Sequence, residues 1–90
     1  MLSTLEDLFK IARERKNSPV EGSYTNKLLS NKTLSKQKVI EEINELIESV
    51  ENNSNKIHEA ADVFYHLIIY LEANEIKIED VMQELNKRKK

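Results

Sequence analysis

One segment of eight residues, Asn17 to Tyr24 (NSPVEGSY), holds the only proline and the only glycine of the 90-residue chain. The turns of a multi-stranded sheet depend on these two residues, whereas the leucine, glutamate and lysine that are plentiful here favour helices. The chain is therefore predicted to be all-α, a small bundle of four to five helices. Its length predicts a single domain, residues 1–90.

Helical periodicity predicts where the helices lie. Ser3 and Glu6 form a capping-box pattern, and apolar residues then recur at helical spacing to about Lys16. The segment Asn52 to Asn55 is rich in turn-forming residues and separates two long helical segments. The expected helices span residues 3–16, 25–29, 34–51, 56–74 and 78–89. The apolar stripe of the third consists of Val39, Ile43, Leu46, Ile47 and Val50.

Composition excludes several classes of protein. The absence of cysteine excludes disulfides and thiolate zinc sites. The net charge of −2 argues against binding of nucleic acid through charge alone. No stretch reaches the roughly 18 apolar residues of a membrane span, and the acidic N-terminus does not resemble a signal peptide. A cytoplasmic protein with neither membrane nor nucleic-acid partners is therefore expected.

The segment Ile57 to Leu71 would place apolar side chains around most of a helix, except for one narrow polar stripe. That stripe contains Glu59, Asp62, His66 and Tyr70. A helix that is apolar nearly all round is normally buried. Its carboxylates are therefore expected to lie away from bulk water, with His66 orienting Asp62 or satisfying a polar group of the core.

The preceding helix carries Glu42 and Glu45 one turn apart, with Glu41 beside them. Because the intervening turn is short, the two helices should pack antiparallel and bring these acids opposite Glu59 and Asp62. Two like charges about 4 Å apart repel by roughly 4 kcal/mol at an effective dielectric constant of 20. Protonation, lysines or a divalent cation could relieve this repulsion. The paired arrangement favours the cation, and an all-oxygen site suits Mg²⁺ or Mn²⁺ rather than zinc.

The motifs EEINE (41–45) and EAAD (59–62) resemble the E-E-x-x-E and E-x-x-D signature of the all-α nucleotide pyrophosphohydrolases. Three longer stretches, ERKNSPVEGSYTNKLL, EAADVFYHLIIYL and IEDVMQEL, resemble the phosphoribosyl-ATP pyrophosphohydrolase family within that fold. The resemblance implies Mg²⁺-dependent hydrolysis of phosphoribosyl-ATP to phosphoribosyl-AMP and pyrophosphate, the second step of histidine biosynthesis. A separate cyclohydrolase would act next in the pathway, because the chain is too short to include that domain.

The resemblance also implies roles for individual residues. The expected metal ligands are Glu42, Glu45, Glu59 and Asp62, and the general base would be Glu41 or Glu45. The expected substrate-binding residues are Arg15, Lys16, Ser23, Tyr24, Thr25 and Lys38. The chain departs from the family pattern at Ile40, where many members have glycine, and in a shorter connection near Lys32.

The nearly all-apolar helix needs more cover than three short neighbours provide, so a homodimer or larger homo-oligomer is expected to complete the core. Two other functions fit the sequence. A house-cleaning nucleoside triphosphate pyrophosphatase would use the same acids, and a non-catalytic helical interaction protein would pair them with lysines. Mg²⁺-dependent turnover, and its loss in Asp62→Asn, would separate an enzyme from the interaction protein.

Overall fold

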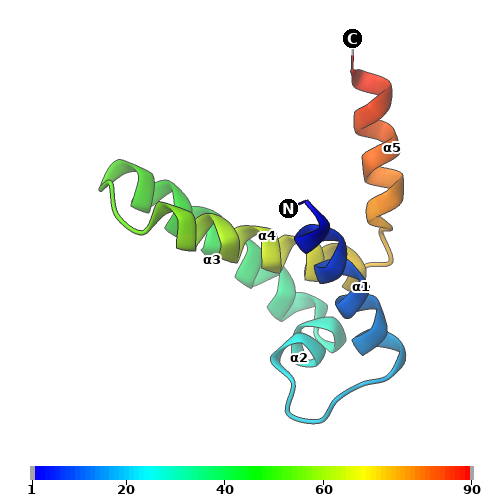
Figure 1. Ribbon diagram of the computed structural model, residues 1–90. Helices are drawn as coiled ribbons and strands as arrows, with labels where there is room; N and C mark the ends of the chain where they lie inside the picture. Colours follow the sequence, from blue (N-terminus) through cyan, green and yellow to red (C-terminus); the bar gives the residue numbers. More distant parts are fainter. Residues whose placement is uncertain (1, 90) are drawn as a thin grey trace.

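The computed structural model describes residues 2–89, which form five α-helices and no β-strand (Figure 1). The helices are α1 (Ser3–Asn17), α2 (Tyr24–Ser30), α3 (Lys32–Glu51), α4 (Lys56–Ala73) and α5 (Ile78–Arg88). The prediction of an all-α protein with four to five helices is confirmed. No helix among the described residues combines the length and the apolar character needed to cross a bilayer.

Helix α4 is central, because it contacts all four other helices. The fully buried residues Ala12, Leu28 and Ile69 form a core cluster where α1, α2 and α4 meet. Burial of apolar side chains is the main force that holds such a small bundle together. This cluster fixes α1 and α2 against the C-terminal half of α4, so the loop between them lies beside that helix.

Two helix starts differ from the capping pattern of the sequence. The Asn31 side chain accepts a hydrogen bond from the Leu34 backbone N–H at 3.0 Å, so α3 begins two residues before the expected Leu34. At α1 the capping position is taken by Leu2, whose apolar side chain cannot accept a hydrogen bond, and Ser3 already lies inside the helix. The capping box predicted at Ser3 is therefore wrong.

A tight reversal joins α3 to α4. Asn53 and Asn55 have left-handed backbones, with φ of 52° and 49°, a conformation that asparagine tolerates better than most residues. The Ser54 N–H donates to the Ser49 carbonyl at 2.9 Å across the same turn. The two helices consequently run antiparallel as a hairpin (Figure 1), as the short turn predicts.

Helix α3 buries polar residues and exposes apolar ones. Its buried residues are Ser35, Glu42 and Ser49, which share one face of the helix. The large apolar residues Ile40, Ile43, Ile47 and Val50 are between 40% and 57% exposed. The expected apolar stripe of this helix is thus largely turned away from α4, the reverse of an ordinary surface helix.

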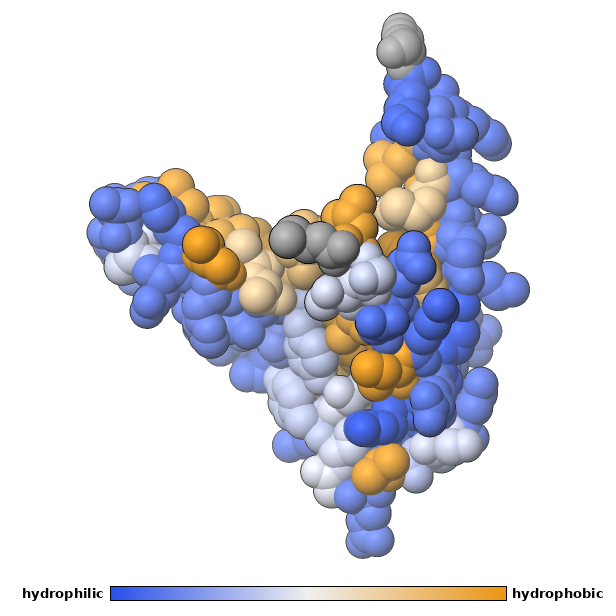
Figure 2. All heavy atoms as spheres, viewed as in Figure 1, coloured by the Kyte–Doolittle hydropathy of each residue, from blue (hydrophilic) through white to orange (hydrophobic). Residues whose placement is uncertain are grey.

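The exposed apolar surface continues beyond α3. On α4 the exposed fractions of Ile57 and Phe64 are 88% and 55%, and on α5 those of Met82 and Leu85 are 46% and 51%. Figure 2 shows apolar residues along one side of the α3–α4 hairpin and on the side of α5 that faces it. Helix α5 extends away from the other helices (Figure 1), and the space-filling view shows an open hollow between it and the hairpin (Figure 2).

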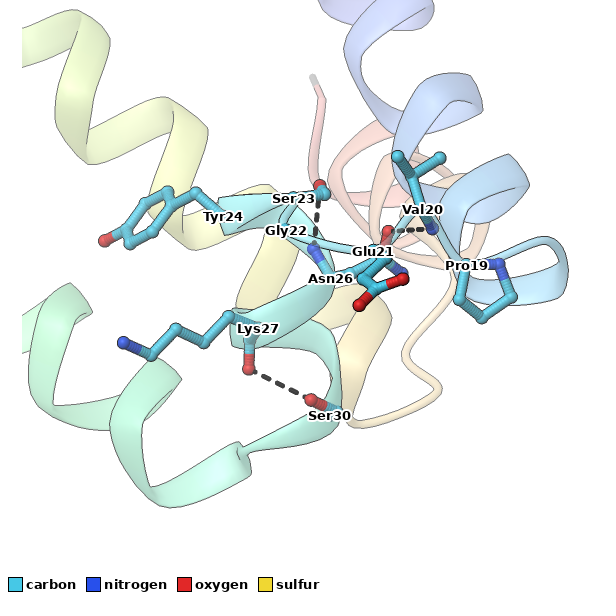
Figure 3. A pocket seen from close by; sticks show the side chains of 9 residues that line it. All are labelled: Pro19, Val20, Glu21, Gly22, Ser23, Tyr24, Asn26, Lys27 and Ser30. Atoms are coloured by element: carbon cyan, nitrogen blue, oxygen red, sulfur yellow. Dashed lines mark hydrogen bonds between the residues drawn. The ribbon is translucent and has the colours of Figure 1, made fainter.

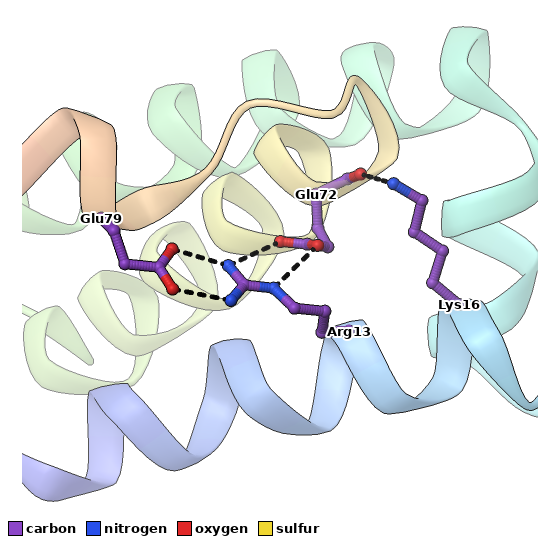
Figure 4. Close-up of polar contacts among 4 residues, drawn as sticks. All are labelled: Arg13, Lys16, Glu72 and Glu79. Carbon is purple, nitrogen blue, oxygen red and sulfur yellow. Dashed lines mark hydrogen bonds and ion pairs between the residues drawn. The ribbon is translucent and has the colours of Figure 1, made fainter.

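Arg13 of α1 attaches α5 to the bundle. Its guanidinium donates to Glu72 of α4 at 3.2 Å and, through two nitrogens, to Glu79 of α5 at 2.7 and 2.8 Å (Figure 4). Beside it, the Lys16 amino group donates to the Glu72 backbone carbonyl at 2.9 Å. A cation at the C-terminal end of α4 is also favourable for the helix dipole.

Candidate active site

The hairpin of α3 and α4 brings the four expected metal ligands together. Carboxylate oxygens of Glu42, Glu45 and Glu59 all lie within 4.8 Å of one another. Glu59 and Asp62 belong to a second group of the same size, together with His58. Glu59 is shared by the two groups, so these acids form one continuous cluster between the helices.

The cluster holds carboxylates in unfavourable surroundings. Glu42 is only 8% exposed, and burial, followed by the hydrogen bond and negative charge of Glu45, raises its pKa. Burial and then the charge of Glu45 also raise the pKa of Glu59. Within residues 2–89, the Oε2 atoms of Glu42 and Glu59 are buried without any hydrogen-bond partner. Buried acceptors without a partner are costly, so the chemistry of this donor set fits a cation.

Glu41 lies at the edge of the cluster. Its carboxylate is exposed and forms an ion pair with the Lys38 amino group at 3.4 Å. It is not a member of either group of potential ligands formed by the described residues. The two candidate bases are therefore in different settings, since Glu45 lies among the potential metal ligands and Glu41 lies outside them.

His58 was missed by the sequence analysis, which found no role for it. Its Nε2 lies 3.3 Å from Asp62 Oδ2, and the imidazole is largely exposed. The spacing of four residues on one helix could have indicated this contact, because side chains at i and i+4 are neighbours. His58 thus adds a nitrogen donor at the open end of the acid cluster.

His66 connects the acid-bearing helix α4 to α2. One ring nitrogen, Nδ1, lies 2.8 Å from the Asp62 backbone carbonyl, and the other, Nε2, lies 3.0 Å from the Tyr24 hydroxyl. The contact with Asp62 therefore involves its backbone, while its carboxylate is near His58. The Tyr24 ring stacks on Tyr65 and meets the His66 ring edge-on.

The segment between α1 and α2 is held by several side chains. Ser23 caps α2 by accepting from the Asn26 N–H at 3.2 Å, and it also accepts from Arg15 at 3.0 Å. The Asn26 side chain accepts from the Val20 N–H at 2.8 Å and donates to the Arg15 carbonyl at 2.7 Å. Gly22, with φ of 79°, supplies the left-handed turn. Asn26 was not predicted, because its role depends on the folded loop.

This loop borders a hollow of about 610 Å³ lined by residues of the loop and α2 (Figure 3). Tyr24 also lines the hollow, and its ring extends from the start of α2 toward the helices that carry the acids (Figure 3). Thr25, the next residue, is hydrogen-bonded to the Tyr65 hydroxyl of α4. The loop therefore has two sides, one facing the hollow and one facing the acid cluster.

The predicted substrate residues fall into three places. Arg15, near the end of α1, contacts Ser23 of the loop, while Tyr24 and Thr25 of α2 contact α4. Lys38 lies on α3 beside Glu41. Lys16 is the exception, because its amino group is engaged at the C-terminal end of α4 (Figure 4).

Comparison with known proteins adds an independent line of evidence. The model of a family described as phosphoribosyl-ATP pyrophosphohydrolase matches residues 3–89. A phosphoribosyl-ATP pyrophosphatase from Methanococcoides burtonii is 39% identical over 95 residues, covering 98% of this chain and 94% of that protein. The Clostridium acetobutylicum protein of the same name is 42% identical over 88 residues, covering 93% and 79%. The histidine biosynthesis bifunctional protein HisIE of Pyrococcus furiosus is 39% identical over 92 residues, covering 99% of this chain and 43% of that protein.

Proposed function

Because the chain belongs to the phosphoribosyl-ATP pyrophosphohydrolase family, we propose that it hydrolyses phosphoribosyl-ATP to phosphoribosyl-AMP and pyrophosphate. This is the second step of histidine biosynthesis. The observation that carries the proposal is the cluster of facing acids between α3 and α4, in which two buried oxygens have no partner among the described residues. Hydrolysis of a phosphoanhydride needs neutralisation of charge and an oriented water more than covalent chemistry.

The cluster suits Mg²⁺, with Mn²⁺ as a possible substitute, because hard divalent cations prefer oxygen ligands. The residues that would hold it are Glu42, Glu45, Glu59 and Asp62. When bound, such a cation neutralises charge on the phosphate oxygens and on the departing pyrophosphate. The raised pKa values of Glu42 and Glu59 support this assignment, since a cation would stabilise their ionised forms.

A carboxylate near the cluster would accept the proton of the attacking water. Glu41 and Glu45 are the two candidates, and the surroundings favour Glu41. Glu45 lies among the oxygens that would hold the cation, whereas Glu41 lies outside both ligand groups of the described residues. The partner of Glu41, Lys38, could exchange its ion pair for a substrate phosphate and leave the carboxylate free.

The loop before α2 would bind the rest of the substrate. Arg15, near the end of α1, contacts Ser23 of the loop, and the contacts of Tyr24 and Thr25 with α4 hold the start of α2 near the acids. Lys16 would contribute indirectly by holding the end of α4 to α1. A guanidinium can bind phosphate through two hydrogen bonds, so Arg15 is the strongest candidate of these residues for a phosphate oxygen.

The protein would act in the cytoplasm as a homodimer or larger homo-oligomer, with the next step catalysed by a cyclohydrolase. The surface of α3 supports an oligomer, because the large apolar residues of this helix are exposed while its buried residues are polar. Large exposed apolar patches are rare on monomers and typically mark interfaces. Since this face adjoins the acid cluster, the active site would include residues of two chains.

The test of the proposed function is pyrophosphate release in the presence of Mg²⁺, with phosphoribosyl-ATP compared against ATP, GTP and oxidised nucleoside triphosphates. A preference for phosphoribosyl-ATP of at least about 100-fold in kcat/KM, or about 2.7 kcal/mol, is expected. A preference for a free triphosphate would instead indicate a house-cleaning pyrophosphatase. A folded protein that hydrolyses none of them would contradict an enzymatic role.

A further inference from the structure

The hydrogen bonds of His66 determine which of its nitrogens carries the proton. A backbone carbonyl can only accept a hydrogen bond, so Nδ1, which lies 2.8 Å from the Asp62 carbonyl, must be the protonated nitrogen. A neutral imidazole carries a single N–H. Nε2 of the neutral ring is therefore an acceptor.

This assignment determines the direction of the next hydrogen bond. The Tyr24 hydroxyl lies 3.0 Å from Nε2 of His66, and when the ring is neutral the hydroxyl donates its only proton to that nitrogen. The Tyr24 oxygen can then only accept a hydrogen bond from any other group. In the described part of the chain, no other side chain is hydrogen-bonded to this oxygen.

The position of Tyr24 places this acceptor near the acid cluster. Tyr24 is the first residue of α2, and its ring extends toward the helices that carry the acids (Figure 3). The ring stacks on Tyr65 at a centroid distance of 6.4 Å and meets His66 edge-on at 5.9 Å. Partial burial raises the pKa of Tyr24, the charge of Lys38 opposes this shift, and the charge of Glu42 adds to it. Since Tyr24 is still 45% exposed, a ligand can reach it.

We propose that the Tyr24 hydroxyl oxygen accepts a hydrogen bond from a ribose hydroxyl of the bound nucleotide, and that His66 is the positioning residue that gives Tyr24 this polarity. The inference rests on the proposed function for the identity of the nucleotide. Ionised phosphate oxygens are acceptors, so they cannot pair with this oxygen. The ribose is the donor group next to the phosphates, and the phosphates would lie at the acid cluster.

The polarity of the pair can be tested without any ligand. In ¹⁵N-labelled protein in alkaline buffer, the nitrogen NMR spectrum of His66 should show Nδ1 protonated and Nε2 unprotonated. His58 is the only other histidine of the chain and is largely exposed, so it provides the reference. Tyr24→Phe should shift the Nε2 signal of His66, because the accepted hydrogen bond is lost. A proton on Nε2 of neutral His66 would overturn the inference.

Recognition of the ribose is tested by kinetics. Phosphoribosyl adducts of ATP, 2′-deoxy-ATP and 3′-deoxy-ATP are compared as substrates of the wild type, Tyr24→Phe and the control Tyr65→Phe. Removing the hydroxyl that Tyr24 binds should lower kcat/KM of the wild type by roughly 2- to 12-fold, the range of a single neutral hydrogen bond. Tyr24→Phe should lose this preference, while Tyr65→Phe should keep it.

The outcomes separate this inference from the proposed function. Turnover of all three adducts with an unchanged preference in Tyr24→Phe would overturn the role of Tyr24 and leave the proposed function intact. The discrimination of Tyr24→Phe can also be compared between adducts that carry adenine and adducts that carry hypoxanthine. If the substitution changes discrimination between these bases, but not discrimination between ribose and deoxyribose, the ribose is not the donor. Turnover of none of the adducts would contradict the proposed function itself, and recognition of the ribose with it.

Discussion

Glu42 is the clearest case of a single residue whose surroundings serve function rather than stability. It occupies the buried face of α3, where an apolar residue would ordinarily lie, and its Oε2 has no partner among the described residues. Buried polar groups without partners destabilise a fold. Glu42 is therefore expected to lower the free energy of unfolding of the metal-free protein and to raise it when a cation binds.

Substitution of Glu42 tests both effects on stability. Because burial raises the pKa of Glu42 above its usual 4.5, ionisation opposes folding, and its contribution to the free energy of unfolding decreases as the pH rises through the raised pKa. Glu42→Gln should therefore stabilise the metal-free protein at pH 7 by roughly 1 kcal/mol, at the low end of the cost of an unsatisfied buried group. Urea unfolding with and without Mg²⁺ measures this.

The matched control is Glu51→Gln, at the exposed end of the same helix, which should change neither stability nor the response to Mg²⁺. In Glu42→Gln, by contrast, added Mg²⁺ should no longer raise the free energy of unfolding. A Glu42→Gln variant that is less stable than the wild type without metal would contradict this account of the residue.

At the scale of single elements, the ends of the helices depend on particular side chains. Asn31 caps α3 through its contact with the Leu34 N–H, whereas Ser3 lies inside α1 and caps nothing. Asn31→Ala is expected to lower the free energy of unfolding by about 1 kcal/mol, and Ser3→Ala to change it little. Chemical denaturation at a fixed protein concentration measures both, and equal effects of the two substitutions would show that the caps are assigned incorrectly.

Helix α5 is attached to the bundle by the buried side chain of Ile78 and by the polar contacts of Arg13, which joins it to α1 and α4. The Arg13 guanidinium lowers the pKa of Glu79 to about 2, so the stabilisation from this pair is present above pH 4.5 and is lost as the pH falls toward 2. Arg13→Met should speed amide hydrogen exchange throughout α5 at neutral pH. Arg88→Met, which removes only a pair within α5, should leave exchange at the start of the helix unchanged.

At the scale of the whole molecule, the sequence predicts some features and not others for physical reasons. Helices follow from local periodicity, and the facing acids follow from two such helices joined by a short turn. The contact of Tyr24 with His66 and that of Lys16 with Glu72 join residues 42 and 56 positions apart. Such pairs depend on how the helices pack, which periodicity does not report. Which residues of the apolar stripe of α3 are exposed depends on the same packing.

The exposed stripe leads to a prediction about assembly. Ile47 on α3 is 52% exposed, so a charge there should be tolerated by the fold of one chain but not by an apolar interface. Ile47→Glu should convert a dimer or larger assembly to a monomer and lower the activity with it, as measured by sedimentation and turnover. Gln83→Glu, on the exposed polar side of α5, is the control for the added charge. A wild type that is monomeric at high concentration would contradict the assembly.

The central claim is that the four facing acids hold the cation that makes hydrolysis possible. The most direct measurement is pyrophosphate release from phosphoribosyl-ATP at saturating Mg²⁺ by the wild type, Asp62→Asn, Glu59→Gln and the control Asp80→Asn on exposed α5. Each of the two cluster variants should lose at least about 100-fold in kcat, or about 2.7 kcal/mol, while the control keeps full activity. Wild-type turnover in both Asp62→Asn and Glu59→Gln would contradict the claim.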